Sequence, residues 1–451
     1  MSSLRQKIST LVKGDPLLVR VLRNTGYLFS SQSLGMLLAL GQSILAARLL
    51  GSDLFGVLTI VMAFAANINR LFSFRMGEFV IRFMGRELEK KEYARAGAIA
   101  KVAGMTEGLT SILAFLIYML LVPLGARLFA KDLTTVPLFQ LYGLYILANL
   151  TTETATGILQ LHNQFKVQAR INIAQSLLTA GLIAIAFFTR GTLEFVLWAY
   201  LIGKWVTGMG PIIAAAVVLD QKMGRGWWRS SLSLLPPFRE LVGFAFSTNL
   251  SGTVKMLVSE SEPLLIGYFL NTQAVALYKI AINVVNPLMI PISQFINTTF
   301  PEMTKSIVSK KWKELRRLLR GVTLISGAWT IVFFLIMLVL GPWILSFWGG
   351  EYVAAYPTMM ILIVGYGIAN IFFWNRTLLL SFGKANIPLF VLLAVAILKT
   401  LSAFYFVPLY GINAEAALLS GNFVLSVGIL VAIGLGMIRK FERETKAGTA
   451  E

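Results

Sequence analysis

Long apolar segments recur along the whole chain and limit the folds that it can adopt. Hydrophobic residues make up 57% of the 451 residues and charged residues only 14%, which is unlike a soluble globular protein. Segments of about 20 apolar residues can cross the hydrocarbon core of a membrane as helices. The predicted spans are 26–50, 53–74, 96–123, 136–160, 168–189, 193–219, 241–269, 273–301, 320–346, 355–381, 386–409 and 413–438. The sequence therefore predicts an all-α integral membrane protein with about 12 transmembrane helices.

The second half of the chain repeats the pattern of the first half at a shift of 220 positions. The segment 50–53 corresponds to 270–273, Lys90 corresponds to Lys310, and the turn at Gly191 corresponds to the turn at Gly411. Identity between the halves is low, but the same shift aligns several separated segments without a gap. Internal repeats are typical of transporters, which hold the substrate between the two halves. We therefore predict two six-helix lobes around a central cavity.

The basic residues are distributed unevenly between the predicted loops. The formal net charge is +19, yet the loops predicted on the outer side of the membrane hold only Arg127, Lys131 and Arg190. Most other Lys and Arg residues lie in the N-terminus, the alternate loops and the C-terminus, which is the positive-inside pattern. We therefore predict both termini in the cytoplasm, and two lobes related by a pseudo-twofold axis along the membrane normal. The basicity reflects topology and does not indicate a nucleic-acid partner.

The predicted domains follow from the spans and from the linker between the two copies. They are a basic interfacial segment (1–24), an N-terminal lobe (25–219), a linker (220–240), a C-terminal lobe (241–438) and a tail (439–451). The basic segment is followed by a span too long for a cleavable signal. Residues 305–320 form a second amphipathic stretch with many basic residues. Such a stretch anchors a protein at the membrane surface, and it can bind anionic lipid or a partner enzyme.

Residue types that carry much enzyme chemistry are scarce. The chain has no cysteine and only one histidine, His162, which we expect to be a solvated loop residue. Gly383 and Lys384 do not form a phosphate-binding loop, because Leu378 and Ala385 stand where such a loop requires Gly and Ser or Thr. The predicted outer loops are too short to house a catalytic domain. We therefore expect no enzyme activity, no metal site and no cofactor.

Charged residues inside the predicted spans are the candidate functional residues, because such charges line a water-filled path or pair with one another. The basic ones are Arg48, Arg70, Lys204, Lys255, Lys279, Arg376 and Lys399, and the clear acidic ones are Glu107, Glu153, Glu260 and Glu262. Asp53, Glu194 and Glu415 lie at the outer edges of spans and are set aside. The positive excess favours an anionic substrate over a cationic drug, since low-dielectric walls strengthen the attraction.

Several of these charges also have a structural interpretation. Arg48 and Arg70 lie near span ends, from which their side chains can reach the interface. An ion-pair cluster is the alternative for four residues of the seventh and eighth spans, namely Lys255, Glu260, Glu262 and Lys279.

Lys204 and Lys399 lie in the middle of their spans, where a long side chain is least able to reach water. Pairing with Glu107 or Glu153 would neutralise them. Both a cavity role and an ion-pair role therefore remain open for these two residues.

Four motifs resemble one family of membrane transporters. Residues 47–56, ARLLGSDLFG, are similar to the A-R-x-L-G-x-x-x-F-G signature of Wzx-like polysaccharide flippases. The segments 300–305, 382–384 and 407–417 are similar to later motifs of these proteins, although Glu415 falls near a position that is usually small. The chain thus resembles flippases of the multidrug/oligosaccharidyl-lipid/polysaccharide exporter superfamily over essentially its whole length.

The resemblance implies a V-shaped pair of lobes with alternating access to the cavity. The implied cargo is an oligosaccharide on a polyprenyl diphosphate, moved from the cytoplasmic to the outer leaflet for cell-surface polysaccharides such as O-antigen or exopolysaccharide. Arg48 matches a cavity arginine in relatives such as the lipid II flippase. Arg70 lies close to a second, and Lys279 lies about one turn from a third.

These considerations give three sets of predicted site residues. The substrate-binding set is Arg48, Arg70, Lys255 and Lys279. The coupling or ion-pair set is Glu260, Glu262 and Glu153, which would exchange protons or sodium ions. The secondary cavity charges are Lys204, Arg376 and Lys399.

The expected partners are membrane lipid, the lipid-linked oligosaccharide and a glycan polymerase or glycosyltransferase, in the inner (plasma) membrane of the cell. Two alternatives remain at this point. One is a multidrug or organic-cation antiporter of the same superfamily, which should present acidic residues to its cavity. The other is a non-transporting scaffold for glycan enzymes. A major-facilitator transporter has less support, because its Gly-x-x-x-Asp-Arg loop is absent.

Overall fold

The computed structural model describes residues 16–235, 260–384 and 386–447, and these residues form helices with no strand among them. Ten helical segments of the described residues are long and apolar enough to cross a membrane. The first of these, Ser30–Glu89, contains two predicted spans. It does so because α2 (Pro16–Leu71) runs through a kink at Gly51, where φ is 69°. Most of the predicted seventh span lies outside the described residues. The predicted all-α, multi-pass membrane fold is confirmed.

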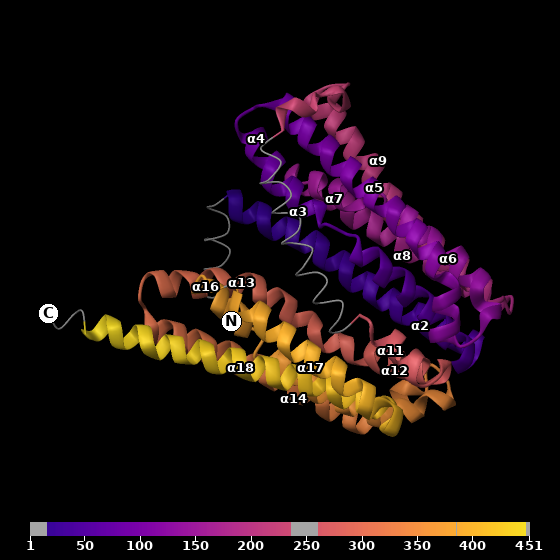
Figure 1. Cartoon of the computed structure of the whole chain (residues 1–451). Helices are drawn as coiled ribbons and strands as arrows, with labels where there is room; N and C mark the ends of the chain where they lie inside the picture. Colours follow the sequence, from indigo (N-terminus) through magenta and orange to yellow (C-terminus); the bar gives the residue numbers. More distant parts are fainter. Residues whose placement is uncertain (1–15, 236–259, 385, 448–451) are drawn as a thin grey trace. The chain divides into compact units, whose positions relative to one another are not determined.

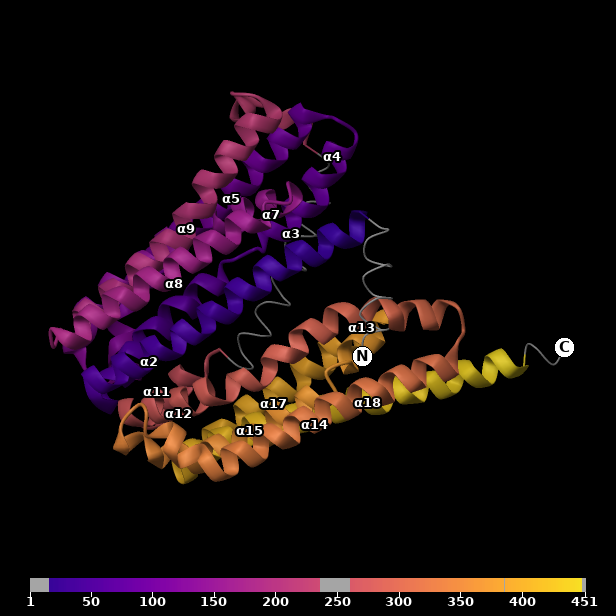
Figure 2. The ribbon, with the colours of Figure 1, turned by 180° about the vertical axis from the view of Figure 1, so that it is seen from behind.

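The chain divides into two compact units (Figures 1 and 2). Unit 1 comprises Met1–Leu49, Ala65–Pro123 and Val136–Leu250, and unit 2 comprises Leu50–Phe64, Leu124–Thr135 and Ser251–Glu451. Unit 1 contains α3 (Met76–Phe79), α4 (Gly85–Glu89), α5 (Tyr93–Gly125, whose last residues belong to unit 2), α6 (Val136–Ala148), α7 (Thr152–Leu161), α8 (Phe165–Phe188) and α9 (Leu193–Met223). Unit 2 contains α11 (Glu262–Phe269), α12 (Thr272–Val285), α13 (Ile290–Val308), α14 (Trp312–Leu345), α15 (Tyr356–Ile371), α16 (Asn375–Ser381), α17 (Asn386–Tyr410) and α18 (Ile412–Ala447).

The helix bounds repeat at the predicted shift of 220 positions. Adding 220 to the bounds of α8 gives 385–408, beside Asn386–Tyr410 for α17, and α5 and α9 correspond in the same way to α14 and α18. The turns before α8 and α17 match as well. Asn163 and Gly383 have φ values of 56° and 73°, and the backbone N–H after each one bonds to the carbonyl five residues earlier, at 2.8 and 3.0 Å. A left-handed residue ends a helix in this way.

The fourth predicted span of each copy is a broken helix. Span 136–160 consists of α6 and α7, and span 355–381 consists of α15 and α16. Each predicted span is still one candidate membrane span, Leu133–Leu161 and Gly350–Ser381. The sequence did not predict the interruption inside it, because three residues do not change the apolar pattern. Within a membrane, the backbone groups that such a break frees must find partners inside the protein.

A side chain of the preceding long helix bonds to the freed backbone groups in each unit. In unit 1, the Glu107 carboxylate of α5 accepts hydrogen bonds from the backbone N–H of Glu153 at 2.8 Å and of Thr154 at 2.9 Å. In unit 2, Ser326 Oγ of α14 donates to the carbonyl of Ile371 at 3.0 Å. In unit 1 the side chain thus caps the N-terminus of α7. In unit 2 it bonds to the last carbonyl of α15.

The predicted eighth span is also interrupted. α12 begins at Thr272 behind Asn271, whose side chain accepts a hydrogen bond from the N–H of Ala274 at 2.8 Å. A 3-10 turn, Asn286–Met289, separates it from α13. Pro287 lies in this turn and has no N–H to continue the α-helical ladder. The interruption therefore occurs where proline removes a donor.

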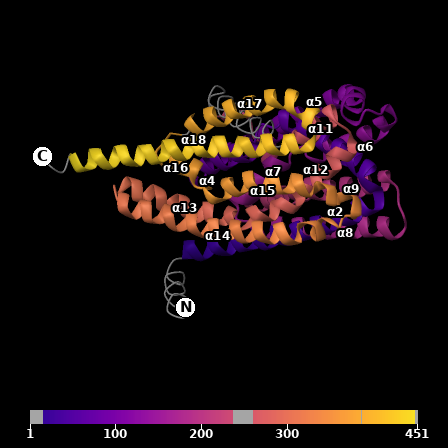
Figure 3. The same ribbon diagram turned by 90° about the horizontal axis from the view of Figure 1, so that it is seen from below.

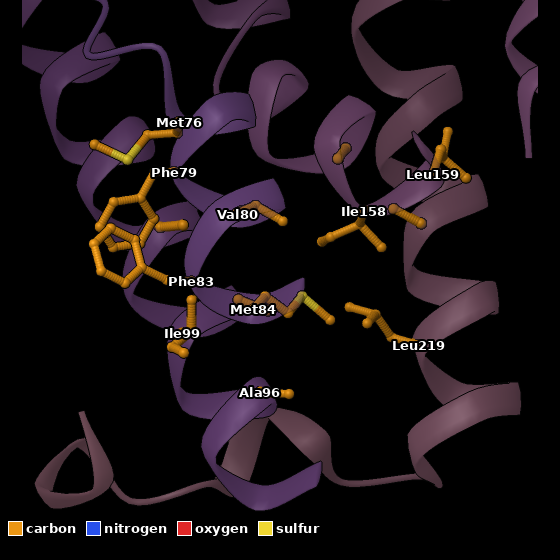
Figure 4. Packing of buried hydrophobic residues seen from close by; sticks show 14 of the residues in the cluster. Met76, Phe79, Val80, Phe83, Met84, Ala96, Ile99, Ile158, Leu159 and Leu219 are labelled. Atoms are coloured by element: carbon orange, nitrogen blue, oxygen red, sulfur yellow. The ribbon is translucent and has the colours of Figure 1, made fainter. Parts of the chain in front are cut away.

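Each unit has an apolar core at one end. In unit 1, a π-helical turn, Val80–Met84, packs against α5, α7 and α9 (Figure 4), with the rings of Phe79 and Phe83 4.9 Å apart. In unit 2, Trp312, Phe382 and Phe441 form a stack with interplanar angles of 12–15°. This aromatic stack fixes the start of α14 beside the end of α18; these two helices are visible along the side of unit 2 in Figure 3. The start of α14 belongs to the basic stretch 305–320, so we call the region around Trp312, Phe382 and Phe441 the basic end of unit 2.

Candidate functional site

A lysine and two glutamates meet in the interior of unit 2. The Lys399 ammonium lies 3.6 Å from Glu262 Oε1 and donates a shorter hydrogen bond to Glu415 Oε1. The lysine side chain is 1% exposed and the two glutamate side chains are 0% exposed. Because one cation serves two carboxylates, this buried cluster has a formal charge of −1 when all three groups are ionised.

The surroundings of the cluster favour negative charge but leave part of it unbonded. Glu262 and Glu415 both lie in the first turn of a helix, α11 and α18 respectively, where the helix dipole stabilises an anion. Glu415 Oε2 is nevertheless buried with no hydrogen-bond partner among the described residues, whereas Glu262 has the hydroxyl of Tyr278 in α12 beside it. A buried anion with free acceptor oxygens is costly. The cluster can therefore accept one proton.

The partners of Lys399 differ from those predicted. The sequence indicated Glu107 or Glu153, whereas the structure pairs Lys399 with Glu262 and Glu415. The prediction was wrong because Glu415 was treated as an edge residue, although it is fully buried in the first turn of α18. The sequence did contain an indication, because Glu415 falls near a motif position that is usually small in the polysaccharide flippases.

The charged residues of α5, α7 and α9 have different partners. Glu107 caps α7, and Glu153 accepts a hydrogen bond from Ser73 Oγ at 2.7 Å. The Lys204 ammonium lies over the ring of Tyr145, 5.6 Å from its centroid, which is a cation–π contact. Lys204 therefore contacts an aromatic face in place of the predicted carboxylate.

Arg48 and Arg70 both belong to α2 but lie on either side of its kink. Arg48 is exposed and precedes Gly51, whereas Arg70 is partly buried in the last turn. The 19 residues from Gly51 to Arg70 correspond to about 28 Å of helix. A single diphosphate spans only a few ångströms, so it contacts these two arginines one at a time.

The other predicted site residues are less gathered. Lys279 is partly buried in α12, and no carboxylate of the described residues lies within ion-pair distance of it. Arg376 is exposed in α16, and Glu260 is partly exposed just before α11. Lys255 lies outside the described residues. The predicted cluster of Lys255, Glu260, Glu262 and Lys279 is therefore described only in part, and its Glu262 pairs with Lys399.

Polar contacts within unit 2 join the residues after Gly51 to the start of α12. The Asp53 carboxylate accepts hydrogen bonds from Thr272 Oγ1 at 3.2 Å and from Gln273 Nε2 at 3.0 Å. A Cβ at Gly56 would collide with the carbonyl of Thr272, so glycine permits this close approach. Asp53, which the sequence analysis set aside, is therefore a contact residue of α12.

Solved structures of several transporters share this fold. An inward-facing multidrug resistance MATE family transporter of the MOP superfamily aligns with a TM-score of 0.71 at 15% identity, covering 91% of this chain and 96% of that chain. The lipid II flippase MurJ in an inward closed conformation aligns with a TM-score of 0.68 at 13% identity, covering 91% and 87%. A MOP superfamily transporter from Pyrococcus furiosus aligns with a TM-score of 0.61 at 14% identity, covering 95% and 97%. At these identities the likeness shows the fold, and it confirms the predicted fold class.

The sequence shows the family of the chain. No curated protein matches it by sequence. Residues 21–307, more than half of the chain, match a family described as polysaccharide biosynthesis protein. This match confirms the resemblance on which the sequence analysis relied. The chain belongs to the polysaccharide biosynthesis protein family.

Proposed function

We propose that this protein is a flippase that moves a polyprenyl-diphosphate-linked oligosaccharide from the cytoplasmic to the outer leaflet by alternating access. The observation that carries the proposal is membership of a polysaccharide biosynthesis family in a chain that shares its fold with a lipid II flippase. In this proposal both termini face the cytoplasm of the inner (plasma) membrane, and glycan polymerases or glycosyltransferases use or supply the cargo. The positive excess among the intramembrane charges agrees with an anionic cargo.

The cargo diphosphate would contact basic residues in sequence along its path. Arg48 lies just before the Gly51 kink, and Arg70 lies 19 residues, or about 28 Å of helix, beyond it. In this proposal, Arg48, Arg70 and Lys279 of α12 are separate binding positions for the diphosphate. The diphosphate then needs only a modest affinity for each basic residue, so that it can leave one residue and bind the next.

The cluster of Glu262, Lys399 and Glu415 is the proposed coupling site. Lys399 already occupies the space between the two carboxylates, where a sodium ion would otherwise bind. The remaining formal charge of −1 is neutralised by one proton. Proton uptake changes the cost of burying the cluster, so the two transport states can differ in proton affinity, as coupling requires.

A vesicle assay with a fluorescent lipid-linked glycan tests the flippase proposal. The protein is reconstituted into liposomes, and the label that reaches the opposite leaflet is measured by quenching. We expect Arg48→Ala and Arg70→Ala to reduce the rate about tenfold each, since a charged contact contributes about 1.5–3 kcal/mol. Lys440→Ala, an exposed residue at the end of α18, should keep the wild-type rate. Wild-type rates in both arginine variants would refute the electrostatic part of the proposal.

Ion gradients test the coupling site separately. A proton gradient should stimulate translocation by the wild-type protein, and a sodium gradient at constant pH should not. Glu415→Gln should keep basal translocation but lose the stimulation, because Lys399 and Glu262 then form a neutral pair with no proton to exchange. Stimulation by sodium alone, or unchanged proton stimulation in Glu415→Gln, would contradict a proton site here.

The organic-cation antiporter has less support from the structure. That function requires carboxylates available to a cationic ligand. Glu107 is bonded to the start of α7, and Glu262 is fully buried beside Lys399. The same vesicles distinguish the two functions, because an antiporter would exchange a fluorescent organic cation for protons and leave the lipid-linked glycan in place.

A further inference from the structure

The basic end of unit 2 contains a cavity that none of the functions above uses. The cavity has a volume of about 690 Å³ and opens between the start of α14 and the end of α18. Five cationic side chains line it, namely Lys313, Arg316, Arg317, Arg320 and Arg439. Among the residues that the structure describes, no acidic residue lines it. The cavity is therefore a concentrated site of positive charge.

Little of this charge is compensated by neighbouring carboxylates. Arg316 forms an ion pair with Glu442 at 2.5 Å. For the other four cationic residues, no carboxylate of the described residues lies within ion-pair distance. Like charges held this close repel one another. An anion in the cavity would relieve this repulsion.

Apolar side chains line the cavity beside the cationic ones, and the apolar surface continues along α14. Leu319, Leu324, Leu435 and Ile438 line it together with the charges. Leu324 is 66% exposed, and the stripe continues along α14 through Ile331, Leu335 and Val339, which are also exposed. This stripe has the character of a surface that faces lipid chains.

The spacing along α14 arranges charge and apolar surface in the order of a lipid molecule. Lys313, Arg317, Arg320 and Leu324 follow one another at helical spacing and lie on one face. From Lys313 to Leu324 the helix rises about 16 Å. That distance takes the wall from the headgroup layer into the hydrocarbon core of a bilayer. A ligand with an anionic head and apolar chains fits both parts.

The cavity wall is held in place by side-chain contacts. Trp374 lines the cavity, and its Nε1 donates to Thr323 Oγ1 at 2.8 Å. Trp312, one residue before Lys313, donates from Nε1 to Thr445 Oγ1 at 3.1 Å. The cationic side chains therefore extend from a backbone frame that is already ordered before a ligand binds, which lowers the entropic cost of binding.

We propose that this cavity binds the head of an anionic phospholipid, with the acyl chains along the exposed stripe of α14. The site is distinct from the proposed cargo-binding positions on α2 and α12, and the proposal does not depend on the flippase function. The phosphate of such a lipid would pair with the arginines that have no carboxylate partner, and its acyl chains would cover the apolar stripe. Arginine suits this role because its planar guanidinium binds phosphate oxygens in pairs.

Native mass spectrometry of the purified full chain in detergent tests the proposal. Phosphatidylglycerol and phosphatidylcholine with identical acyl chains are titrated, and the lipid-bound fraction is measured. We expect tighter binding of phosphatidylglycerol. The variant R317Q/R320Q/R439Q should lose on the order of 100-fold in that affinity, since each basic residue near a lipid surface contributes roughly fivefold. Leu324→Gln, which keeps every charge, should weaken binding of both lipids.

A matched variant separates the cavity from the general charge of the region. K311Q/K440Q/R443Q also removes three charges, one from the N-cap of α14 and two from the end of α18, and none of these residues lines the cavity. It should bind phosphatidylglycerol within twofold of the wild type. Equal losses in the two triple variants would overturn the proposal.

Two further ligands identify the source of the anion. Inorganic phosphate and glycerophosphoglycerol should compete at least 100-fold less well than phosphatidylglycerol, because they lack chains for the apolar stripe. Competition at the same concentration by either would overturn the assignment to a lipid. Stronger competition by polyprenyl phosphate than by phosphatidylglycerol would overturn the assignment to a phospholipid and indicate the cargo carrier.

Discussion

Lys399 of α17 donates a hydrogen bond to Glu415, sixteen positions further along the chain in the first turn of α18. The same ammonium lies 3.6 Å from Glu262, in the first turn of α11. Lys399 of α17 is therefore shared by carboxylates from two other helices, α11 and α18. Removing the cation and removing one of the anions should consequently have opposite electrostatic effects.

Lys399→Met should destabilise unit 2 strongly. It leaves two adjacent carboxylates without a cation in an interior that excludes water, a change that costs about 3–5 kcal/mol. Thermal unfolding in detergent, followed by the loss of monodisperse protein, measures the effect. The double variant Lys399→Met/Glu415→Gln should recover part of the loss, because only one carboxylate remains and it can be protonated. A double variant less stable than the single variant would contradict this account.

Glu107→Ala should weaken the junction between α6 and α7. The substitution removes the acceptor for the backbone N–H groups of Glu153 and Thr154, and each buried donor left without a partner costs about 1–3 kcal/mol. Glu107→Gln keeps one acceptor oxygen, so its α7 amides should be protected less than in the wild type and more than in Glu107→Ala. Glu194→Ala, at the exposed start of α9, is the control. Hydrogen exchange of the α7 amides is the measurement, and unchanged protection in Glu107→Ala would exclude the capping role.

Two glycines on neighbouring helices should respond to alanine in opposite directions. A Cβ at Gly208 of α9 would collide with the carbonyl of Ala148, the last residue of α6, whereas a Cβ at Gly181 of α8 would meet nothing within 4 Å. Gly208→Ala should therefore lower the unfolding temperature. Gly181→Ala should raise the stability by up to about 1 kcal/mol, the difference in helix propensity. A stable Gly208→Ala protein would show that the two helices can separate at this point.

The only histidine should make stability depend on pH. Burial, and to a smaller extent the positive charge of Lys222, lower the pKa of His162 below its usual value of 6.5. The unfolded chain therefore binds a proton at higher pH than the folded chain, so the contribution of neutral His162 is present above about pH 6.5 and is lost as the pH falls. Between pH 7 and pH 5, the unfolding temperature of the wild type should decrease more than that of His162→Gln. Parallel decreases in the two proteins would assign the pH dependence to other groups.

Much of the fold follows from the sequence because composition and period report on it directly. The apolar spans and the break at Gly51 are properties of local sequence, and the repeat is visible when the two halves of the sequence are compared. The division of the fourth span into α6 and α7 is different. It depends on Glu107, which lies 46 positions before Glu153 and caps a helix to which it is not adjacent in sequence. A local pattern does not contain that information.

The candidate site was predictable only as a set of charges. The sequence identified Lys399 and Glu262 as intramembrane residues, and both belong to the buried cluster. It did not identify Glu415, because depth in the membrane was inferred from position along an apolar span, and a residue at a span edge can still be enclosed by other helices. Pairing between helices depends on tertiary packing, so the partner of Lys399 required the structure.

The broken fourth helix occurs at matching positions in both halves of the chain, but the two halves bond the freed groups differently. The position that corresponds to Glu107 in the second half is Gly327, and there Ser326 donates to the carbonyl of Ile371 instead. The break therefore does not require one particular supporting side chain, because a carboxylate that accepts serves in one half and a hydroxyl that donates serves in the other. A substitution at Glu107 and one at Ser326 accordingly remove different kinds of hydrogen bond, although each side chain supports the same interruption.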